Sequence, residues 1–513
     1  MPRPSTPSFR FKLMDLFPDA SAFKKAYQAG TSQVVWTTLV SDLDTPVSAF
    51  LKLAKDQANS FLLESVEGGA IRGRYSFIGL KPDLIWRCVG DKAEINRQAA
   101  TNADAFEACD EPSIPSLKAL VEESCIDLPY GLPPMAAGLV GYMAYDSVRL
   151  VENLPDINPD VLGVPDGIFV RPTIMAVFDT IEDTVTLITP ARPVEGISAD
   201  DAFDNAVNRL AEAVSLMESS LPQQSDRKEL ETPEPVSNMP HSRFHEIVEK
   251  AKQYILAGDI FQVVLSQRFA VPFKLPPFSL YRALRRLNPS PFLFHLNFGD
   301  FSIVGSSPEI LVRVREGKVT IRPIAGTRPR GATPDEDEAL AAELLADPKE
   351  LAEHLMLLDL GRNDVGRVAK VGTVKVTEQM KIERYSHVMH IVSNVEGELA
   401  PDYDAIGALF AGFPAGTVSG APKVRAMEII DELENEKRGI YAGCIGYFGA
   451  NGDMDTCIAL RTAVVKDDTM YVQAGGGIVA DSDPEAEYQE SRNKARALIR
   501  AAEEAVRFAS ARN

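Results

Sequence analysis

Three short turn signals, each flanked by strand-like apolar stretches, constrain the fold of this chain more than any other feature. They are FGD at 298–300, REGK at 315–318 and GANGD at 449–453. Each has the glycine and polar residues of a tight β-hairpin turn. Residues 177–191 predict a further hairpin, and residues 201–217 have the apolar spacing of a helix. Hairpins interspersed with helices predict an α+β protein with largely antiparallel sheets rather than a doubly wound parallel one.

A polar, proline-rich segment without apolar periodicity, residues 219–241, is typical of a linker. It divides the chain into an expected N-terminal region, 1–218, and a second domain, 242–513. The second domain opens with a helical pattern that ends at Gly258. A length of 513 residues supports a division, because it exceeds what one ordinary hydrophobic core fills.

The charge and cysteine content narrow the function classes. A net charge of −20 disfavours nucleic acid and anionic membranes as partners. No apolar run reaches the roughly 18–20 residues that cross a bilayer, and the first residues lack the apolar region of a secretory signal. The five cysteines are scattered without a CxxC pair, which indicates reduced thiols and a cytoplasmic location rather than disulfides or a zinc site.

A first candidate for ion binding is the helix predicted over 347–360. Asp347 is suited to the N-cap, and Gly361 is expected to end the helix. Glu350 and Glu353 are three residues apart, so their side chains share a neighbouring face.

A second predicted helix begins after Asp483 and carries Glu487, Glu490 and Lys494 on one stripe. Two helices with paired carboxylates can converge on Mg²⁺, which proteins hold through one or two carboxylates. The plainer alternative is that these glutamates are solvated, as glutamates on helices usually are, and that Glu350 has no role beyond capping the helix. The spacing therefore leaves both interpretations open.

Three further segments are candidates for anion binding, each with a plainer alternative. The stretch at 322–331 predicts a strand and a loop with two arginines, Arg328 and Arg330, that can hold an anion. Residues 473–479 contain three glycines between a strand and a helix, where a tight turn is the alternative. Residues 416–430 form an anion loop or simply a helix start. A lone histidine in a strand-like run, such as His390, is more often structural than catalytic.

Seven motifs together go beyond these patterns: PIAGTRPRG, ELAEHLMLLDLGRNDVGRV, RYSHVMHIVSNVEGEL, GTVSGAPKVRAMEII, YAGCIGYFGANGDMDTCIALRT, VQAGGGIV and ESRNKARAL. They occur in the order seen in chorismate-utilising enzymes. From about residue 240 to 500 the chain closely resembles the large subunit, component I, of anthranilate synthases. A weaker resemblance covers FLLESVEGG and GRYSFIGLKP in the N-terminal half.

The resemblance implies antiparallel sheets packed as a sandwich with helices outside. It also implies a Mg²⁺-dependent lyase that converts chorismate and ammonia to anthranilate and pyruvate, the first committed step of L-tryptophan biosynthesis. Ammonia is then supplied from glutamine by an amidotransferase subunit, component II, and L-tryptophan inhibits by feedback.

The same resemblance assigns residues by motif. The Mg²⁺ ligands are Glu353 and Glu490, with Glu350 and Glu487 as outer-sphere support. The substrate-binding positions are Gly326, Thr327, Tyr441, Arg461, Gly475, Gly476, Gly477 and Lys494. The catalytic positions are Glu309 as general acid for the departing hydroxyl, His390 in the elimination, and Thr417 in an active-site loop. The tryptophan site comprises Ser65, Pro291, Phe292, Leu293 and Pro46.

Two positions distinguish members of this family. Aminodeoxychorismate synthases commonly have lysine where this chain has Ala325, and the water-using relatives have a lysine base at the position of Gln262. A methyl group cannot attack the ring and a neutral amide cannot activate water. Both residues favour anthranilate synthase over aminodeoxychorismate synthase component I, and the retained glutamates disfavour a non-catalytic regulatory homologue. No cysteine lies in a Gly-x-Cys-x-Gly setting, so ammonia is expected from a separate subunit or from solution.

Overall fold

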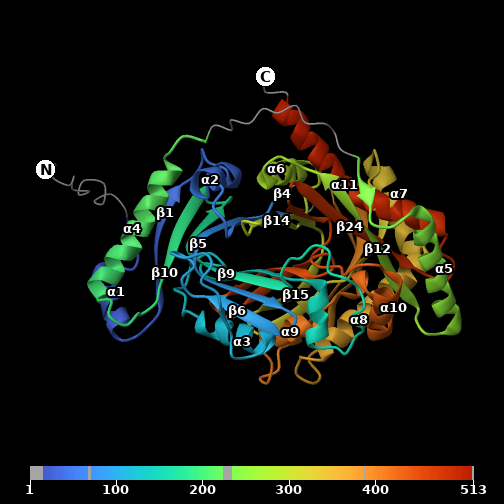
Figure 1. Cartoon of the computed structure of the whole chain (residues 1–513), viewed down its shortest axis with the longest axis horizontal. Coiled ribbons are helices and arrows are strands. Elements are labelled where there is room, and N and C mark those ends of the chain that lie inside the picture. Colours follow the sequence, from blue (N-terminus) through green and yellow to red (C-terminus); the bar gives the residue numbers. More distant parts are fainter. Residues whose placement is uncertain (1–14, 68–70, 223–233, 386–387, 511–513) are drawn as a thin grey trace.

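Two long neighbouring strands, β5 (Tyr75–Val89) and β9 (Gly167–Asp179), belong to both sheets of the protein. At one end β5 pairs with β2 (Ser60–Glu64) and β9 with β10 (Thr184–Ala191). At the other end β5 pairs with β6 (Lys92–Asn96) and β9 with β8 (Gly138–Met143). The two sheets therefore diverge from a shared pair of strands. The computed structural model describes residues 15–67, 71–222, 234–385 and 388–510 (Figure 1).

The first sheet continues from β2 and β10 with the strands β1 (Gln33–Val40), β13 (Phe292–Asn297), β14 (Phe301–Ser307), β23 (Thr462–Lys466), β24 (Thr469–Ile478) and β12 (Gln262–Pro272), and at its far edge with the short β11 (Val236–Ser237) and β20 (Gly420–Ala421). Each of these pairings is antiparallel. The predicted turn at 298–300 joins β13 to β14.

The second sheet continues from β6 and β8 with β7 (Glu107–Ala108), β21 (Cys444–Gly449), β22 (Met454–Ile458), β15 (Ile310–Arg315), β16 (Lys318–Ile321), β17 (Ile324–Pro329), β19 (Val388–Glu398) and β18 (Lys375–Arg384). β16 and β17 pair in succession along one side of β19, and β18 pairs along the other. The predicted turns at 315–318 and 449–453 are both confirmed, as β15–β16 and β21–β22.

One hydrophobic cluster packs the two sheets together. Phe294 and Ile303 of the first sheet lie in the same buried cluster as Tyr142 and Ile445 of the second. The predicted class, α+β with antiparallel sheets packed as a sandwich, is therefore confirmed. Small β3 (Val66–Glu67) and β4 (Ile71–Arg72) form a separate ribbon.

Helices cover the outer faces (Figure 1). Those that share a buried cluster with the first sheet are α1 (Ala20–Gln28), α2 (Pro46–Leu53), α4 (Ala199–Met217), α6 (Pro277–Leu287) and α11 (Pro484–Ser510). Those whose apolar residues pack with the second sheet and the β12 edge are α3 (Ser113–Glu123), α5 (His241–Ala257), α8 (Pro348–Gly366), α9 (Ala405–Gly412) and α10 (Lys423–Leu433). α7 (Pro334–Ala346) packs with β19 in a smaller cluster, and the 3₁₀ turns are η2 (Tyr145–Leu150) and η3 (Gly416–Val418).

The helix ends follow their local signals except at one glycine. Gly258 ends α5 in the left-handed conformation, and Asp347 caps α8 as predicted. Gly361 does not end α8, which continues to Gly366. A Cβ atom on Gly361 would lie 3.4 Å from both Ile321 and Pro323, so this glycine lets α8 pack closely against the β16–β17 connection.

Strands from before residue 218 complete both sheets of the later part of the chain. β2 pairs with β13, and β8 pairs with β21. Within the predicted linker, Val236–Ser237 pair with β12, and residues 223–233 lie outside the described residues. The expected boundary at 219–241 stays a prediction. In the described part of the chain, no helix combines the length and hydropathy needed to cross a membrane.

Candidate active site

A run of three glycines, residues 475–477, lies inside β24 next to β12. The expectation of a loop here is wrong. A Cβ atom on Gly476 would lie 2.8 Å from Glu487 Oε2, and one on Gly477 would lie 2.1 Å from Gln262 Nε2. The glycines therefore leave room for polar side chains from neighbouring elements to approach the strand.

The carboxylate of Glu353 on α8 reaches this part of the first sheet. Gln262 Nε2 donates to Glu353 Oε1 at 3.5 Å. Burial raises the pKa of Glu353, and the negative charges of Glu350 and Glu490 raise it further. The two helices singled out by their spacing thus do bring their carboxylates into one electrostatic cluster.

The opening turns of α11 supply the other half of this acidic cluster. Ser482 Oγ donates to Glu487 Oε1 at 2.7 Å, and burial raises the pKa of Glu487. Lys494 Nζ lies 2.7 Å from Glu490 Oε1 and donates to the Gly475 carbonyl oxygen at 3.0 Å. Lys494 therefore joins the helix to the glycine strand and partly compensates the negative charge.

The donor set of the acidic cluster (Glu350, Glu353, Glu487 and Glu490) fits a hard divalent cation. It offers carboxylate oxygens and no imidazole or thiolate, which is the chemistry Mg²⁺ prefers. Among the described residues, three potential ligand atoms within 4.8 Å of one another occur only at a separate histidine-containing cluster. The four glutamates therefore do not bring three carboxylate oxygens within that distance, and an ion held by one or two of them would need further oxygen ligands.

A buried carboxylic acid lies between β14 and β15. Glu309 is 4% exposed, and Thr417 Oγ1 donates to Glu309 Oε1 at 2.8 Å. The backbone N–H of Ile324 donates a second hydrogen bond. Burial raises the pKa of Glu309 to about 8, although both hydrogen bonds act in the opposite direction. Glu309 is therefore protonated at neutral pH and can donate a proton, and Thr417 orients it.

His390 on β19 faces a bulge in β17. Gly326 has φ of +72°, and the register of β17 shifts there, so that Thr327 lies opposite His390. His390 Nδ1 donates to the Gly326 carbonyl oxygen at 2.9 Å, with Thr327 Oγ1 at 3.1 Å from the same nitrogen. Burial lowers the pKa of His390. The neutral ring therefore has its free lone pair at Nε2, where it can accept a proton.

Two residues on the β21–β23 side are suited to hold a carboxylate. The charge of Arg461 contributes to the low pKa of His390, so the two are neighbours. Within the described residues, the Arg461 guanidinium has no hydrogen bond or ion pair to another side chain. Tyr441 is buried, accepts from the Gly475 N–H, and has its pKa raised by burial to about 12, so it remains a donor. A partly buried guanidinium without a side-chain partner is suited to bind an anion, and the Tyr441 hydroxyl is a further donor.

The two arginines of the segment 322–331 do not form the expected anion loop. Arg328 Nη1 lies 3.1 Å from Glu350 Oε1, and its other nitrogens bond Glu343 and Asp347. Arg330 Nε donates to Asp337 at 2.7 Å. Both guanidinium groups are therefore engaged by carboxylates. Arg328 instead braces α7 and α8, and with them Glu350.

Two supporting residues carry no recognisable signal in the sequence. Tyr385 lies with its ring centroid 5.5 Å from that of His390. Arg438 is buried with Glu434 and donates to the carbonyl oxygens of Val418 and Val264, at 2.7 Å each. This ion pair therefore fixes the η3 loop of Thr417 against β12. A charged run such as ELENEKR is typical of solvated surface. The sequence alone does not indicate that Glu434 and Arg438 within it are buried.

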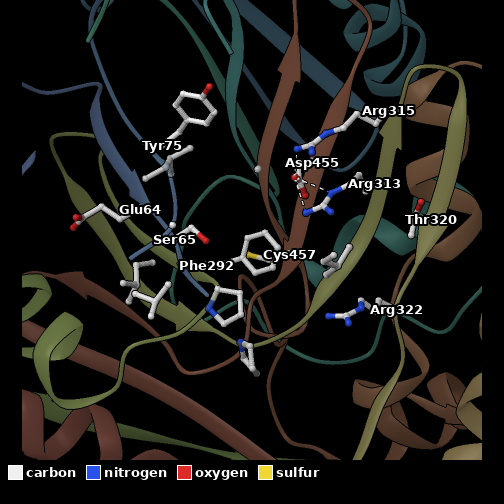
Figure 2. A pocket seen from close by; sticks show the side chains of 18 of the residues that line it. Glu64, Ser65, Tyr75, Phe292, Arg313, Arg315, Thr320, Arg322, Asp455 and Cys457 are labelled. Carbon is white, nitrogen blue, oxygen red and sulfur yellow. Dashed lines mark hydrogen bonds and ion pairs between the residues drawn. The ribbon is translucent and has the colours of Figure 1, made fainter. Parts of the chain in front are cut away.

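A second candidate site is a cavity of about 1120 Å³ between the two sheets (Figure 2). Ser65, Pro291, Phe292 and Leu293 line it, as the regulatory prediction requires. The pairing of Glu64 with Leu293 places the end of β2 beside the start of β13. Pro46 is buried at the start of α2 and is not among the lining residues.

The far end of this cavity approaches the active site. Its lining includes Pro308 and Ile310, on either side of Glu309, and Tyr385, which contacts His390. In Figure 2, Ser65 and Phe292 lie at one side and Arg322 at the other. One continuous space therefore adjoins both the residues predicted to be regulatory and those predicted to be catalytic.

The fold and this pair of sites define a class of protein. Residues 68–500 match the family model for chorismate binding enzymes, and the chain belongs to this family. It is 61% identical over 489 residues to anthranilate synthase component 1 of Cereibacter sphaeroides, covering 95% of this chain and 98% of the relative. It is 50% identical over 478 residues to that of Pseudomonas putida, covering 90% and 93%.

A solved structure of a related protein has the same fold. Anthranilate synthase component I of Streptococcus pneumoniae superimposes with a TM-score of 0.73 at 37% identity, over 90% of this chain and 98% of that one. The resemblance to the anthranilate synthase component I family drawn from the motifs is therefore confirmed. The roles of individual residues stay proposals.

Proposed function

We propose that the protein is an anthranilate synthase component I, which converts chorismate and ammonia to anthranilate and pyruvate with Mg²⁺. The observation that carries this choice within the family is the environment of Ala325 and Gln262. Ala325 is a buried methyl group in β17, and Gln262 is hydrogen-bonded to Glu353. Neither position offers an amine, so the nucleophile must be ammonia from outside the chain.

Chorismate is a dianion, and the site offers two ways to hold its carboxylates. Arg461 and Tyr441 are suited to the enolpyruvyl carboxylate. Glu353 and Glu490 would hold Mg²⁺, with Glu350 and Glu487 acting through water. The ion would supply positive charge at the ring carboxylate.

Two proton transfers follow from the residues. As ammonia forms a bond to ring C2, both ring double bonds shift, the C4–O bond breaks, and Glu309 protonates the departing hydroxide to give water. The added nitrogen loses one proton to become the amine. In the second step a base removes the C2 proton while the C3–O bond to the enolpyruvyl group breaks, which makes the ring aromatic. The departing enolpyruvate takes up a proton at its methylene carbon and becomes pyruvate. The Nε2 lone pair of His390 is suited to accept the C2 proton.

The first prediction concerns the ammonia source. The purified chain should form anthranilate from chorismate, Mg²⁺ and ammonium salts, and should use glutamine only after an amidotransferase subunit is added. The physical reason is a complete chorismate site without a glutaminase nucleophile. Anthranilate fluorescence measures both reactions. Glutamine-driven turnover by the rigorously purified single chain would contradict the prediction.

The proposed setting is the cytoplasm, in complex with an amidotransferase subunit, component II. All five cysteines are unpaired, which fits a reducing compartment.

We propose further that L-tryptophan inhibits by binding the cavity at Ser65, Phe292 and Leu293. Phe292 pairs with Ser307, two residues before Glu309, so the wall of the cavity and the general acid lie on one connected segment. Ser290 Oγ also donates to the Ser307 carbonyl oxygen at 2.7 Å. Tryptophan that favours one position of this segment would weaken chorismate binding, and linkage makes the antagonism reciprocal.

Replacing the regulatory serine should separate inhibition from catalysis. Ser65→Arg introduces bulk and charge into the cavity, so we expect retained activity with inhibition weakened at least about 100-fold. Ser65→Ala, which removes only one hydrogen bond, should weaken it about 10-fold. The measurement is the tryptophan concentration that halves ammonia-dependent turnover. Unchanged inhibition of the arginine variant would place the regulatory site elsewhere.

A further inference from the structure

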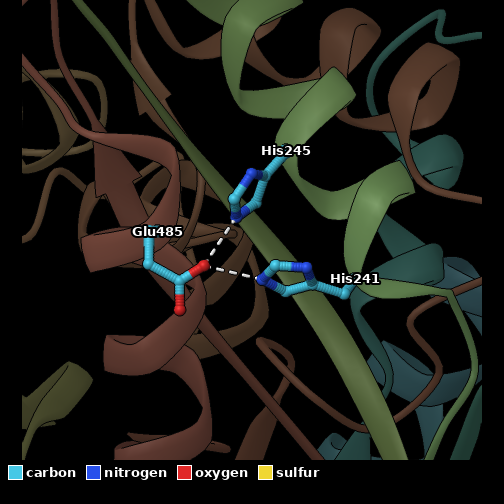
Figure 3. Close-up of side chains that lie close together, drawn as sticks. All are labelled: His241, His245 and Glu485. Atoms are coloured by element: carbon cyan, nitrogen blue, oxygen red, sulfur yellow. Dashed lines mark hydrogen bonds and ion pairs between the residues drawn. The ribbon is translucent and has the colours of Figure 1, made fainter.

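A cluster of two histidines and one glutamate joins α5 to α11. His241 and His245 lie one turn apart on α5, and both direct Nε2 at the same carboxylate oxygen, Glu485 Oε2 (Figure 3). The distances are 2.6 Å from His241 and 3.0 Å from His245. The three potential ligand atoms all lie within 4.8 Å of one another.

The surroundings of the cluster hold its three groups in place. Gln489 Nε2 donates to the other carboxylate oxygen of Glu485 at 2.7 Å, which leaves Oε2 for the imidazoles. The ring of Tyr488 lies edge-on to His241, with ring centroids 4.4 Å apart. Such outer contacts orient metal ligands in known sites.

We propose that His241, His245 and Glu485 form a binding site for a divalent transition metal ion of the Zn²⁺ class. Two imidazole nitrogens and one carboxylate oxygen are the donor set of many zinc sites, with a fourth position open to water. Zinc at about 2.0–2.2 Å from each ligand separates neighbouring ligand atoms by roughly 3.3 Å. The two Nε2–Oε2 separations, 2.6 Å and 3.0 Å, are smaller than this by about 0.3–0.7 Å. The side chains are 52%, 33% and 49% exposed, so they can move apart by this amount.

The site differs from the acidic cluster in its chemistry. Nitrogen donors favour Zn²⁺ over Mg²⁺, whereas the four glutamates favour Mg²⁺. The ion would also connect two elements, because Glu485 lies in the first turn of α11, just before Glu487 and Glu490. The metal would therefore fasten the start of α11 to α5.

The test is Zn²⁺ binding by the full chain after treatment with a chelator, measured calorimetrically in excess Mg²⁺ so that the acidic cluster is occupied. We expect one Zn²⁺ per chain and a rise in Tm, since the ion binds the folded state. Co²⁺ as a second probe should show the visible absorption of a site with nitrogen ligands.

Three variants locate the ion. His245→Asn and Glu485→Gln each remove one ligand and should weaken Zn²⁺ binding by more than the roughly 10–100-fold that outer contacts contribute. Glu249→Gln, which makes the same charge change on the exposed face of α5, should bind like the parent. The proposal is overturned if the parent binds no Zn²⁺ in excess Mg²⁺, or if both ligand variants bind it as tightly as the parent.

Discussion

Glu309→Gln should lower kcat for anthranilate formation by roughly 10²–10⁴-fold, the usual contribution of a general acid. Glutamine keeps the shape of the side chain and can still accept the Thr417 hydrogen bond, so the fold should be retained. The amide has no proton of suitable acidity for the departing hydroxide. A variant with parental kcat would show that another group or water protonates the leaving group.

The pH dependence gives a second, independent readout. The pKa of Glu309 is raised to about 8, so the acid is protonated below that pH and activity should fall as the pH rises through it. The profile must be measured at a fixed concentration of free NH₃, because ammonium itself loses a proton as the pH increases. The glutamine variant should lack this decline.

Thr417→Val tests the assignment without touching the acid. The Thr417 hydrogen bond lowers the pKa of Glu309, so its removal should raise that pKa and move the alkaline decline to higher pH. A decline at the parental pH in this variant would assign it to a different group.

The raised pKa of Glu309 also makes the free energy of unfolding depend on pH. Glu309 has a higher pKa folded than unfolded, so the folded state binds more protons between the model value of 4.5 and about 8. Its contribution to stability is therefore full at low pH and is lost as the pH rises through this window. Glu309→Gln should remove that loss, and denaturant unfolding at several pH values measures it.

Local signals predicted the elements of this fold well, because hairpin turns and helix caps depend on a few adjacent residues. The turn at 315–318 and the end of α5 at Gly258 are examples. The local signals failed at some other glycines. Gly361 and the run 475–477 looked like a helix end and a loop, yet each lies inside a regular element.

These glycines are required by residues distant in the sequence. The run 475–477 is free of side chains because Glu487 from α11 and Gln262 from β12 occupy that space. No local pattern contains this information, since it depends on how strands and helices pack.

In the candidate site, too, local spacing predicted some features, and others depend on residues distant in the sequence. The spacing of Glu487 and Glu490 placed them on one helical stripe, but the approach of Glu353 from α8 could be inferred only from the resemblance. Glu309 and Thr417 are 108 residues apart, and their hydrogen bond follows from the fold alone. The predicted anion-binding role of Arg328 was wrong for a related reason. Its guanidinium is paired with carboxylates of α7 and α8, which are distant from it in the sequence.

The second large effect is expected from the acidic cluster. Glu353→Gln and Glu490→Gln should each lower turnover by about 100-fold or more, since a ligand to the proposed Mg²⁺ and its charge are lost, and several kcal/mol of charge stabilisation correspond to such factors. The Mg²⁺ concentration for half-maximal activity should rise in both. Asp359→Asn on α8 and Glu503→Gln on α11 make matched charge changes at exposed positions and should leave activity unchanged.

In these variants Tm and turnover should change independently of each other. This difference distinguishes a metal site from a structural role. The charges of Glu350 and Glu490 raise the pKa of Glu353, so in the metal-free protein its ionised form is disfavoured by its neighbours. Glu353→Gln removes that repulsion, and its Tm without Mg²⁺ should equal or exceed that of the parent. The parent should gain Tm on addition of Mg²⁺, whereas the variant should gain much less. Parental turnover with unchanged Mg²⁺ dependence in both variants would show that these glutamates are solvated helix residues without a metal-binding role. A large fall in Tm without Mg²⁺ would show that their role is structural.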